Sequence, residues 1–399
     1  MKETLIQEYN NTQFLRIPSI TPKNTIIYNF VDGATCEING PVSKNYRIKF
    51  FNGSTSELVH ETTITNNMWS RTSAKYFIKW RIEIYDEDTN ELVEIYNYNA
   101  KGKRVYIHID STALGDSLAW FPHADEFRKH HDCEVIVSTF HNGWFQDNYP
   151  ELEFVEPGTV VENLYAMYGV GWHYNDKELD KSKHPKEVKT MPMQQTSTSI
   201  LGLPYKEVKP KLTFPITEPA IPGDYVVIAP HASAHAKYWN NRKGWQEVIN
   251  YLNGKGYKVV MITKEPLGDE WHDSKLYGTL EGVIDKTGEY PLEDRYNDIH
   301  HAKAYIGLGS GLSWLAWSTP TPIVLISGFS KPYTEFQDCE RIFDYTPSLC
   351  TGCFNKHWLD PGDWEWCPEH KDTIRQYECT KNITSQKVID ALNKILNIY

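Results

Sequence analysis

The sequence carries little positive charge for its length. Its 41 lysines and arginines are outnumbered by 52 aspartates and glutamates, which gives a formal net charge of −11. Sequence-independent nucleic-acid binding needs a basic surface that neutralises phosphates, so no nucleic-acid partner is expected. No apolar run approaches membrane-spanning length, and the opening residues Met-Lys-Glu-Thr-Leu-Ile-Gln-Glu do not resemble a signal peptide. A cytoplasmic protein without a membrane span is therefore predicted.

Cysteine is scarce outside one segment. Of seven cysteines in 399 residues, Cys36, Cys133 and Cys339 lie far apart, which argues against the dense disulfide framework of a small secreted domain. The remaining composition, 40% hydrophobic and 23% charged, is that of an ordinary globular protein of two or three domains.

The other four cysteines, Cys350, Cys353, Cys367 and Cys379, lie close together near the C-terminus. A Cys-x-x-Cys turn lets two sulfurs meet one ion, and two further thiols complete a tetrathiolate site for zinc or a single iron. Soft ligands alone do not choose between these metals. Clustered surface cysteines or two disulfides are the alternatives.

Five segments follow one another along the chain. Residues 1–98 show β-type alternation at 26–30, 46–51 and 76–85, with turn clusters between, and predict a small sandwich or barrel. An α/β unit is expected at 101–215 and, beyond a proline-rich linker, a second α/β unit at 222–345. The cysteine module at 346–380 and a terminal helix at 385–399 follow.

Both α/β units have the pattern of a parallel sheet. In the first, a strand at 105–109, a turn, a helix at 117–129 and a strand at 134–138 form a βαβ unit. In the second, four apolar strands alternate with helices, one of which places Trp245, Val248, Ile249 and Leu252 on a single face. We expect two doubly wound domains that face each other across a cleft.

Polar groups follow three strands of the second unit, where parallel sheets bind ligands. They are Ser233, His235 and Lys237; Thr263 and Lys264; and the turn Gly309-Ser310-Gly311, with Ser313 nearby. Free amides at the helix start after this turn would suit a pyrophosphate. The turn matches neither a Walker loop nor the dinucleotide fingerprint, so an ordinary tight strand-to-helix turn is the alternative.

Two aspartates follow the first strand of the first unit. Asp110 directly ends the strand and suits a general base for an acceptor hydroxyl. Asp116 lies on the loop before a helix, where an aspartate more often caps the helix. His108 is expected to be a packed core histidine.

Several of these motifs resemble those of the bacterial ADP-heptose heptosyltransferases. The similar segments are Arg104-Val-Tyr-Ile with Leu114-Gly-Asp-Ser-Leu-Ala-Trp-Phe-Pro122, His231-Ala-Ser-Ala-His-Ala-Lys-Tyr-Trp239, Ile284-Asp-Lys-Thr-Gly288 and Gly309-Ser-Gly-Leu-Ser-Trp-Leu-Ala316. The added β-rich unit and the four cysteines resemble the autotransporter heptosyltransferases, which glycosylate adhesin repeats. Gly309 and Trp314 depart from the Asp and His of the lipopolysaccharide enzymes.

This resemblance implies an inverting GT-B glycosyltransferase that moves heptose from ADP-D-glycero-β-D-manno-heptose to serines of an autotransporter passenger. Asp110 or Asp116 would be the base. One structural Fe3+ per subunit, with zinc as the alternative, would be held by the four cysteines of a large ring-like homo-oligomer, expected to be a dodecamer. The implied donor-binding residues are Ser233, Lys237, Thr263, Lys264, Lys286, Ser310, Gly311, Leu312 and Ser313.

Two other functions fit parts of the sequence. One is a glycosyltransferase that acts on a lipid or a lipopolysaccharide-type saccharide. The other is a redox or metal-sensing protein with a rubredoxin-like iron, which would not bind a sugar nucleotide.

Overall fold

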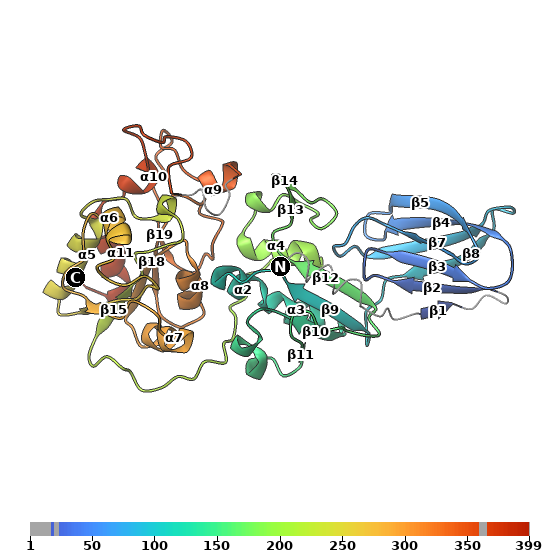
Figure 1. Cartoon of the computed structure of the whole chain (residues 1–399), viewed down its shortest axis with the longest axis horizontal. Helices are drawn as coiled ribbons and strands as arrows, with labels where there is room; N and C mark the ends of the chain where they lie inside the picture. The colour runs from blue at the N-terminus through green and yellow to red at the C-terminus, as the bar shows by residue number, and fades with distance from the viewer. Residues whose placement is uncertain (1–16, 20–23, 359–364, 399) are drawn as a thin grey trace. The chain divides into compact units, whose positions relative to one another are not determined.

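The computed structural model describes residues 17–19, 24–358 and 365–398 (Figure 1). The chain divides into two compact units. The first consists of Met1–Thr112, Trp120–Val188 and Gln194–Val208, and the second of Ala113–Ala119, Lys189–Met193 and Lys209–Tyr399. This division is coarser than the five segments expected from the sequence, whose boundaries stay a prediction.

The N-terminal part of the first unit contains two antiparallel sheets, ordered β1-β2-β3-β6 and β5-β4-β7-β8 (Figure 1). Alternate residues of β4 and β7 are buried, as expected for strands with one face on a core. Tyr28 stacks on Tyr96 at 4.1 Å between ring centroids and so joins the two sheets. The strands are β1 (Ile17–Ser19), β2 (Thr25–Asn29), β3 (Thr35–Asn39), β4 (Asn45–Asn52), β5 (Glu57–Thr65), β6 (Met68–Arg71), β7 (Trp80–Asp86) and β8 (Leu92–Asn97).

The strand expected at 76–85 begins later, at Trp80. The backbone N–H of Phe77 bonds to the carbonyl of Ile200, outside the sheet, and its ring packs edge-on against Phe127. A residue whose amide is used elsewhere cannot join the ladder, so these contacts shorten the strand.

The rest of the first unit is built on a parallel sheet ordered β11-β10-β9-β12. Its strands are β9 (Arg104–Ile109), β10 (Glu134–Ser138), β11 (Glu153–Phe154) and β12 (Ala166–Val170). The single helix expected at 117–129 is wrong: α2 (Leu114–Trp120) ends before α3 (Pro122–His131) begins. Pro122 is at the start of α3, where a missing N–H costs nothing, but inside one continuous helix it would break the hydrogen-bond ladder.

Smaller elements complete this unit. The hairpin β13 (Tyr174–Asn175) and β14 (Glu178–Leu179) lies in the charged stretch expected to be a surface excursion, and α4 (Met193–Leu201) follows it.

The second unit is built on a six-stranded parallel sheet ordered β17-β16-β15-β18-β19-β20. The strand order reverses between β15 and β18, which is the switch point where doubly wound sheets bind ligands. The strands are β15 (Tyr225–Ile228), β16 (Lys258–Met261), β17 (Ile284–Asp285), β18 (Ala304–Leu308), β19 (Ile323–Ile326) and β20 (Glu340–Ile342).

Helices cover this sheet, and the core is the one expected. The stripe of Trp245, Val248, Ile249 and Leu252 is buried in one cluster with the strands, which confirms that prediction. The helices are α5 (Gly244–Gly254), α6 (Glu270–Leu276), α7 (Leu292–His300), α8 (Gly311–Trp317), α9 (Cys353–Lys356), α10 (Glu378–Lys381) and α11 (Ser385–Leu396). Within the described ranges, no helix has both the length and the apolar surface that a membrane crossing needs.

Candidate functional site

The loop after β15 carries a lysine in a mostly buried setting. A short 3-10 turn, η4 (His235–Lys237), brings Nζ of Lys237 within 3.4 Å of the hydroxyl of exposed Ser233. Burial is the largest influence on Lys237 and lowers its pKa, while Glu335 and then Asp116 favour the charged form. This loop therefore offers a cation and a hydroxyl at the switch point of the sheet.

The turn after β18 lies across the switch point from that loop. Ser310 is in an extended conformation before α8, and its buried hydroxyl has no hydrogen-bond partner among the described residues. Ser313 differs, because its hydroxyl donates to the carbonyl of Leu308 at 2.5 Å and lies 3.2 Å from the hydroxyl of Tyr305. Of the two hydroxyls expected to meet a phosphate, only that of Ser310 is unengaged; Leu312 is half-buried beside it.

Two glycines let α2 and α8 approach closely. A Cβ on Gly311 would lie 2.9 Å from Cβ of Leu114, and one on Gly115 would lie 3.2 Å from Cδ1 of Trp314. Atoms at such distances must shift, so this packing requires small residues at both positions. The Gly-Asp motif thus has a structural reason, and Trp314 fills the space beside it.

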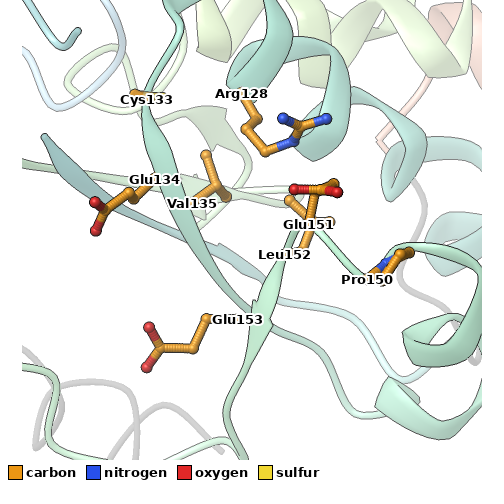
Figure 2. Close-up of a pocket in the computed structure, with 8 residues that line it drawn as sticks. All are labelled: Arg128, Cys133, Glu134, Val135, Pro150, Glu151, Leu152 and Glu153. Carbon is orange, nitrogen blue, oxygen red and sulfur yellow. The ribbon is translucent and has the colours of Figure 1, made fainter. Parts of the chain in front are cut away.

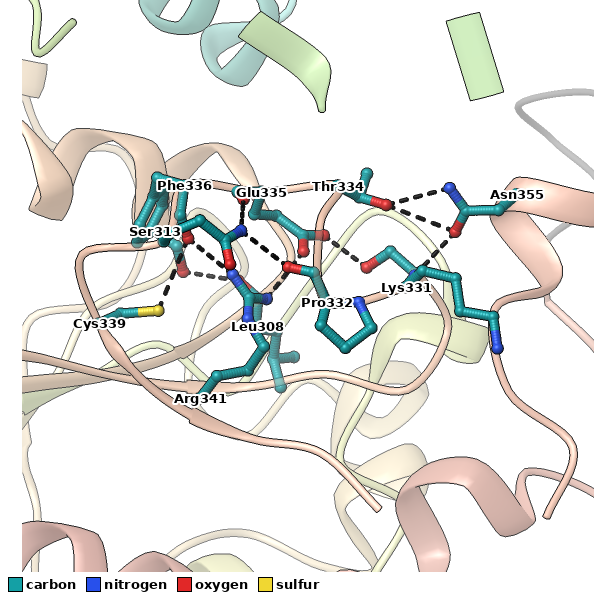
Figure 3. Close-up of polar contacts among 12 residues, drawn as sticks. Leu308, Ser313, Lys331, Pro332, Thr334, Glu335, Phe336, Cys339, Arg341 and Asn355 are labelled. Carbon is teal, nitrogen blue, oxygen red and sulfur yellow. Dashed lines mark hydrogen bonds and ion pairs between the residues drawn. The ribbon is translucent and has the colours of Figure 1, made fainter. Parts of the chain in front are cut away.

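Glu335 lies against the same turn, and Figure 3 shows its polar contacts. Its carboxylate accepts hydrogen bonds from the hydroxyl of Ser330 and, at 3.0 Å, from Nη1 of Arg341. Both side chains of the Glu335–Arg341 ion pair are only 8% exposed. A Cβ added to Gly309 would lie 2.8 Å from Oε1 of Glu335, so this carboxylate occupies the space a side chain at 309 would need.

The loops after β16 and β17 are tied to α7. Arg295 is buried and donates to the carbonyls of Thr263 at 2.9 Å, Gly288 at 2.8 Å, and Lys286. Lys286 forms a 2.6 Å ion pair with buried Asp298. No separate pattern in the sequence marked Arg295 or Asp298, because charged residues recur throughout this helix.

The candidate residues on these two loops differ in accessibility. The hydroxyl of buried Thr263 donates to the carbonyl of Glu265 at 2.8 Å, whereas Lys264 is exposed. Lys286 is half-buried and paired with Asp298, whereas Lys264 is exposed. Lys264 is therefore the more accessible of the two lysines for a ligand.

Asp110 directly follows β9 and pairs with a histidine. Oδ1 of Asp110 lies 2.7 Å from Nδ1 of His108, and since a carboxylate only accepts, the ring nitrogen donates. Nε2 of His173 lies 4.0 Å from Oδ2. Burial acts to raise the pKa of Asp110, but His108, His173 and Lys183 outweigh it, and the pKa is lowered.

His108 is buried, as expected, and it is also the partner of Asp110, which the sequence did not reveal. A Cβ on Gly169 of β12 would lie 2.7 Å from Cε1 of His108, so a glycine there gives the ring its room. Burial lowers the pKa of His173 to about 4, so that ring is neutral near pH 7. Asp110 is thus an ionised carboxylate held by a fixed donor at the β9–β12 switch point.

The two candidate bases lie in different surroundings. Asp110 belongs to the first unit, while Asp116 lies in the first turn of α2, within the second unit, and acts on the charge of Lys237. Asp116 was expected to cap a helix, but it is inside the helix rather than before it.

The four clustered cysteines are free thiols. Cys353, Cys367 and Cys379 are buried and Cys350 is half-buried. Burial, and then the neighbouring thiols Cys350, Cys379 and Cys367, raise the pKa of Cys353, so the other three sulfurs act on Cys353. Soft, mutually close thiols fit a tetrathiolate ion chemically. In geometry, however, no group of three or more potential ligands in the described part of the chain is arranged to hold a metal.

The cysteine segment packs against the lysine loop. Ala236 shares an apolar cluster with Cys353, Cys367 and Tyr377, and the ring of His235 lies 4.5 Å from that of Tyr377. Oγ1 of Thr380 accepts from the backbone and side-chain N–H groups of Asn240 at 3.3 and 3.1 Å. The conformation of the lysine loop therefore depends on the cysteine segment.

A separate hollow of about 440 Å³ lies beside β10 and β11 (Figure 2). Its lining is mostly polar and includes Arg128, Glu134, Glu151 and Glu153. None of the candidate residues lines it, and its carboxylates do not suit a phosphate, so we assign it no part in the site.

Comparison with known proteins identifies the family. Residues 163–335 match the model of glycosyltransferase family 9 (heptosyltransferase). The chain is 34% identical over 389 residues to the autotransporter heptosyltransferase BAHTCr of Citrobacter rodentium, covering 95% of this chain and 91% of that protein. It is 35% identical over 401 residues to the autotransporter heptosyltransferase TibC of Escherichia coli O78:H11, covering 96% and 94%. The chain belongs to the autotransporter heptosyltransferase family.

The structural comparison agrees. The crystal structure of TibC, described as a bacterial iron-containing dodecameric glycosyltransferase, matches with a TM-score of 0.82 and 31% identity over 96% of this chain and 98% of that one. A second TibC structure is a complex with ADP-D-beta-D-heptose. The resemblance read from the motifs is confirmed: this autotransporter heptosyltransferase is a glycosyltransferase with an α/β fold. The family 9 match includes Lys237 and Ser310 but neither Asp110 nor the cysteines.

Proposed function

We propose that this chain transfers heptose from ADP-D-glycero-β-D-manno-heptose to serine hydroxyls of an autotransporter passenger protein. The carrying observation is the position of Lys237 and Ser310 on either side of the β15–β18 switch point. A half-buried cation on one loop, and on the other loop a buried hydroxyl that has no hydrogen-bond partner within the described part of the chain, suit a diphosphate.

The donor would bind through the loops of the second sheet. Lys237, Ser233 and Ser310 would meet the diphosphate and stabilise the negative charge that grows on the departing ADP. Thr263 and Lys264 would lie along the adenosine, and the remaining proposed contacts are Lys286, Gly311, Leu312 and Ser313. The internal bonds of Lys286 and Ser313 favour roles in shaping the site rather than direct phosphate contact.

Asp110 would act as the general base. Its lowered pKa keeps it ionised near pH 7, and His108 fixes one oxygen, leaving lone pairs for the serine proton. The serine oxygen bonds to the anomeric carbon as the bond from that carbon to the phosphate oxygen breaks, which inverts the configuration. Asp116, beside Lys237, would help to hold the donor site.

The finer architecture is also a proposal. We infer a GT-B enzyme with Rossmann-like domains at 101–215 and 222–345, an N-terminal β-domain at 1–98, a cysteine module at 346–380 and a terminal helix at 385–399. The two parallel sheets and the two antiparallel sheets support this organisation.

The cysteines would hold one structural iron, as Fe3+, with zinc as the alternative. Their chemistry and mutual proximity, together with the iron in TibC, support this proposal. Four thiolates leave no open coordination position, so the ion would supply rigidity rather than reactivity. A homo-oligomer like dodecameric TibC, in the cytoplasm, completes the proposal.

The direct test uses purified protein, ADP-heptose and a passenger fragment of an autotransporter adhesin. Intact mass should show additions of whole heptose residues to the passenger. Asp110→Asn keeps the shape of the side chain but not its basicity, and should bind ADP like the wild type without transfer. Addition only to a lipopolysaccharide-type saccharide would contradict the proposed acceptor, and an active Asp110→Asn would contradict the base.

A further inference from the structure

The proposed base Asp110 has one oxygen left for an acceptor hydroxyl. Its Oδ1 accepts from Nδ1 of His108 at 2.7 Å, so Oδ2 is the oxygen that would take the hydroxyl proton. The ring of His173 lies on that side, with Nε2 at 4.0 Å from Oδ2, and the side chains of Asp110 and His173 are each only 11% exposed. An acceptor hydroxyl therefore has little room beside Oδ2.

The ring of His173 is fixed beside the carboxylate. Its Nε2 lies 3.3 Å from the carbonyl of Gly169, and because a carbonyl only accepts, the ring nitrogen donates. The backbone N–H of His173 donates to Nε2 of buried His184 at 3.1 Å, and its carbonyl accepts from the backbone N–H of Asp180 at 3.0 Å. Hydrogen bonds to the ring and to both sides of its backbone thus keep the ring from swinging away to admit a larger acceptor.

Gly171 shows how closely this side of the carboxylate is filled. Its backbone is outside the left-handed region, so conformation does not require a glycine. The space requires one, because an added Cβ would lie 3.1 Å from Cβ of Asp110 and 3.2 Å from Cε1 and Nε2 of His173. Atoms seldom approach so closely, so even one extra methyl group between these two side chains would have to displace one of them.

We propose that His173 and Gly171 determine the acceptor class, admitting the primary hydroxyl of serine to Asp110 and excluding the secondary hydroxyl of threonine. Threonine carries a methyl group on the carbon that bears its hydroxyl, so binding of that hydroxyl at Oδ2 brings a methyl group into the same confined space. One methyl group in a closely fitted site changes kcat/KM by about 10-fold to 200-fold. This inference rests on the proposed function, because it takes Asp110 as the base for an acceptor hydroxyl.

The experiment is a competition between two acceptors in one reaction. A passenger fragment with a single acceptor serine and the same fragment with threonine at that position are mixed with ADP-heptose, and intact mass follows both products. Their initial rates give the serine-to-threonine ratio of kcat/KM. Because both acceptors meet the same enzyme, this ratio does not depend on donor affinity or on the folded fraction. The intrinsic reactivity of each hydroxyl is the same with every variant, so changes in the ratio report the space around Oδ2.

Two variants should move the ratio in opposite directions. The wild type should favour serine, and His173→Ala, which removes the ring, should lower the ratio by about tenfold or more. Gly171→Ala places a methyl group in the same space and should raise the ratio. It should also slow transfer to serine, while the ADP dissociation constant, measured calorimetrically, stays that of the wild type. His130→Ala, which truncates an exposed histidine of α3, is the control and should keep the wild-type ratio.

The outcomes separate the two levels of the proposal. A wild type that transfers heptose to neither acceptor would overturn the proposed function and this inference with it. A wild type that takes serine and threonine equally, or a His173→Ala protein with the wild-type ratio, would overturn this inference alone. So would a Gly171→Ala protein that transfers heptose to serine as fast as the wild type.

Discussion

At the scale of single residues, the decisive feature is which charged or polar side chain each candidate aspartate has as its partner. His108 and Asp110 are two positions apart along an extended chain, so their side chains lie on the same face of the strand, and they form a 2.7 Å hydrogen bond. Asp116 instead acts on Lys237. The structure thus gives the two aspartates different partners, and this favours Asp110 as the base.

The histidine can be tested through the pH dependence of transfer. His108 lowers the pKa of Asp110, so His108→Leu should raise that pKa and move the acid limb of kcat/KM to higher pH. On the acid side of the limb, activity should fall about tenfold further for each unit by which the limb moves, while activity near pH 8 should not change through this effect. His108→Asn, which keeps a donor near Nδ1, should shift the limb less. An acid limb unmoved in His108→Leu would show that His108 only fills space.

At the scale of elements, the lysine loop is braced by a segment more than a hundred residues away. Indole Nε1 of Trp239 and the side-chain amide of Asn241 both donate to the carbonyl of Ile383, at 3.0 and 2.9 Å. Ala236 packs on the cysteine cluster. The loop contains little regular secondary structure, so these long-range contacts decide where Lys237 lies.

Thr380→Val tests this brace with almost no change of shape. It removes the acceptor of two N–H groups of buried Asn240, and stability should fall by about 1–3 kcal/mol. ADP affinity should fall as well, by about threefold to tenfold, because the loop is loosened. Calorimetry and thermal unfolding measure the two effects.

Thr373→Val is the control for this experiment. Thr373 lies in the same segment and is exposed; its hydroxyl donates to the nearby carbonyl of His370 and accepts from the N–H of Arg375. It should leave ADP affinity unchanged. A Thr380→Val protein that is less stable but binds ADP normally would contradict the coupling.

At the scale of the whole molecule, the cysteine segment is the part least able to fold alone. It contributes two helices of four residues each, α9 and α10, and packs one small cluster. Short helices of this kind are unstable without external support. A bound ion would supply that support.

Replacing Cys353, the least exposed of the four clustered cysteines, tests whether they hold an iron ion. Cys353→Ser should lose about one iron per chain, measured by elemental analysis, and unfold about 5–15 °C below the wild type. Cys339→Ser, outside the cluster, should keep both values. Full iron content in Cys353→Ser would contradict the proposed ligand set.

The sequence was sufficient for features that depend on local pattern. Alternation predicted β2 and β4, apolar runs predicted the parallel strands, and the stripe of Trp245 predicted the buried face of α5. Motif spacing was sufficient for the family. It was insufficient where one residue changed a local outcome, as when Pro122 divided one expected helix into two.

The sequence by itself determined the classes of structure and chemistry, because strand period, helix period and loop motifs arise from neighbours along the chain. The tertiary structure alone decided where buried charged groups lie: Arg295 against carbonyls of the loops after β16 and β17, and Glu335 against Gly309. These positions depend on burial and on distances between segments far apart in sequence. A side chain's pKa and orientation follow from those distances, and no local pattern encodes them.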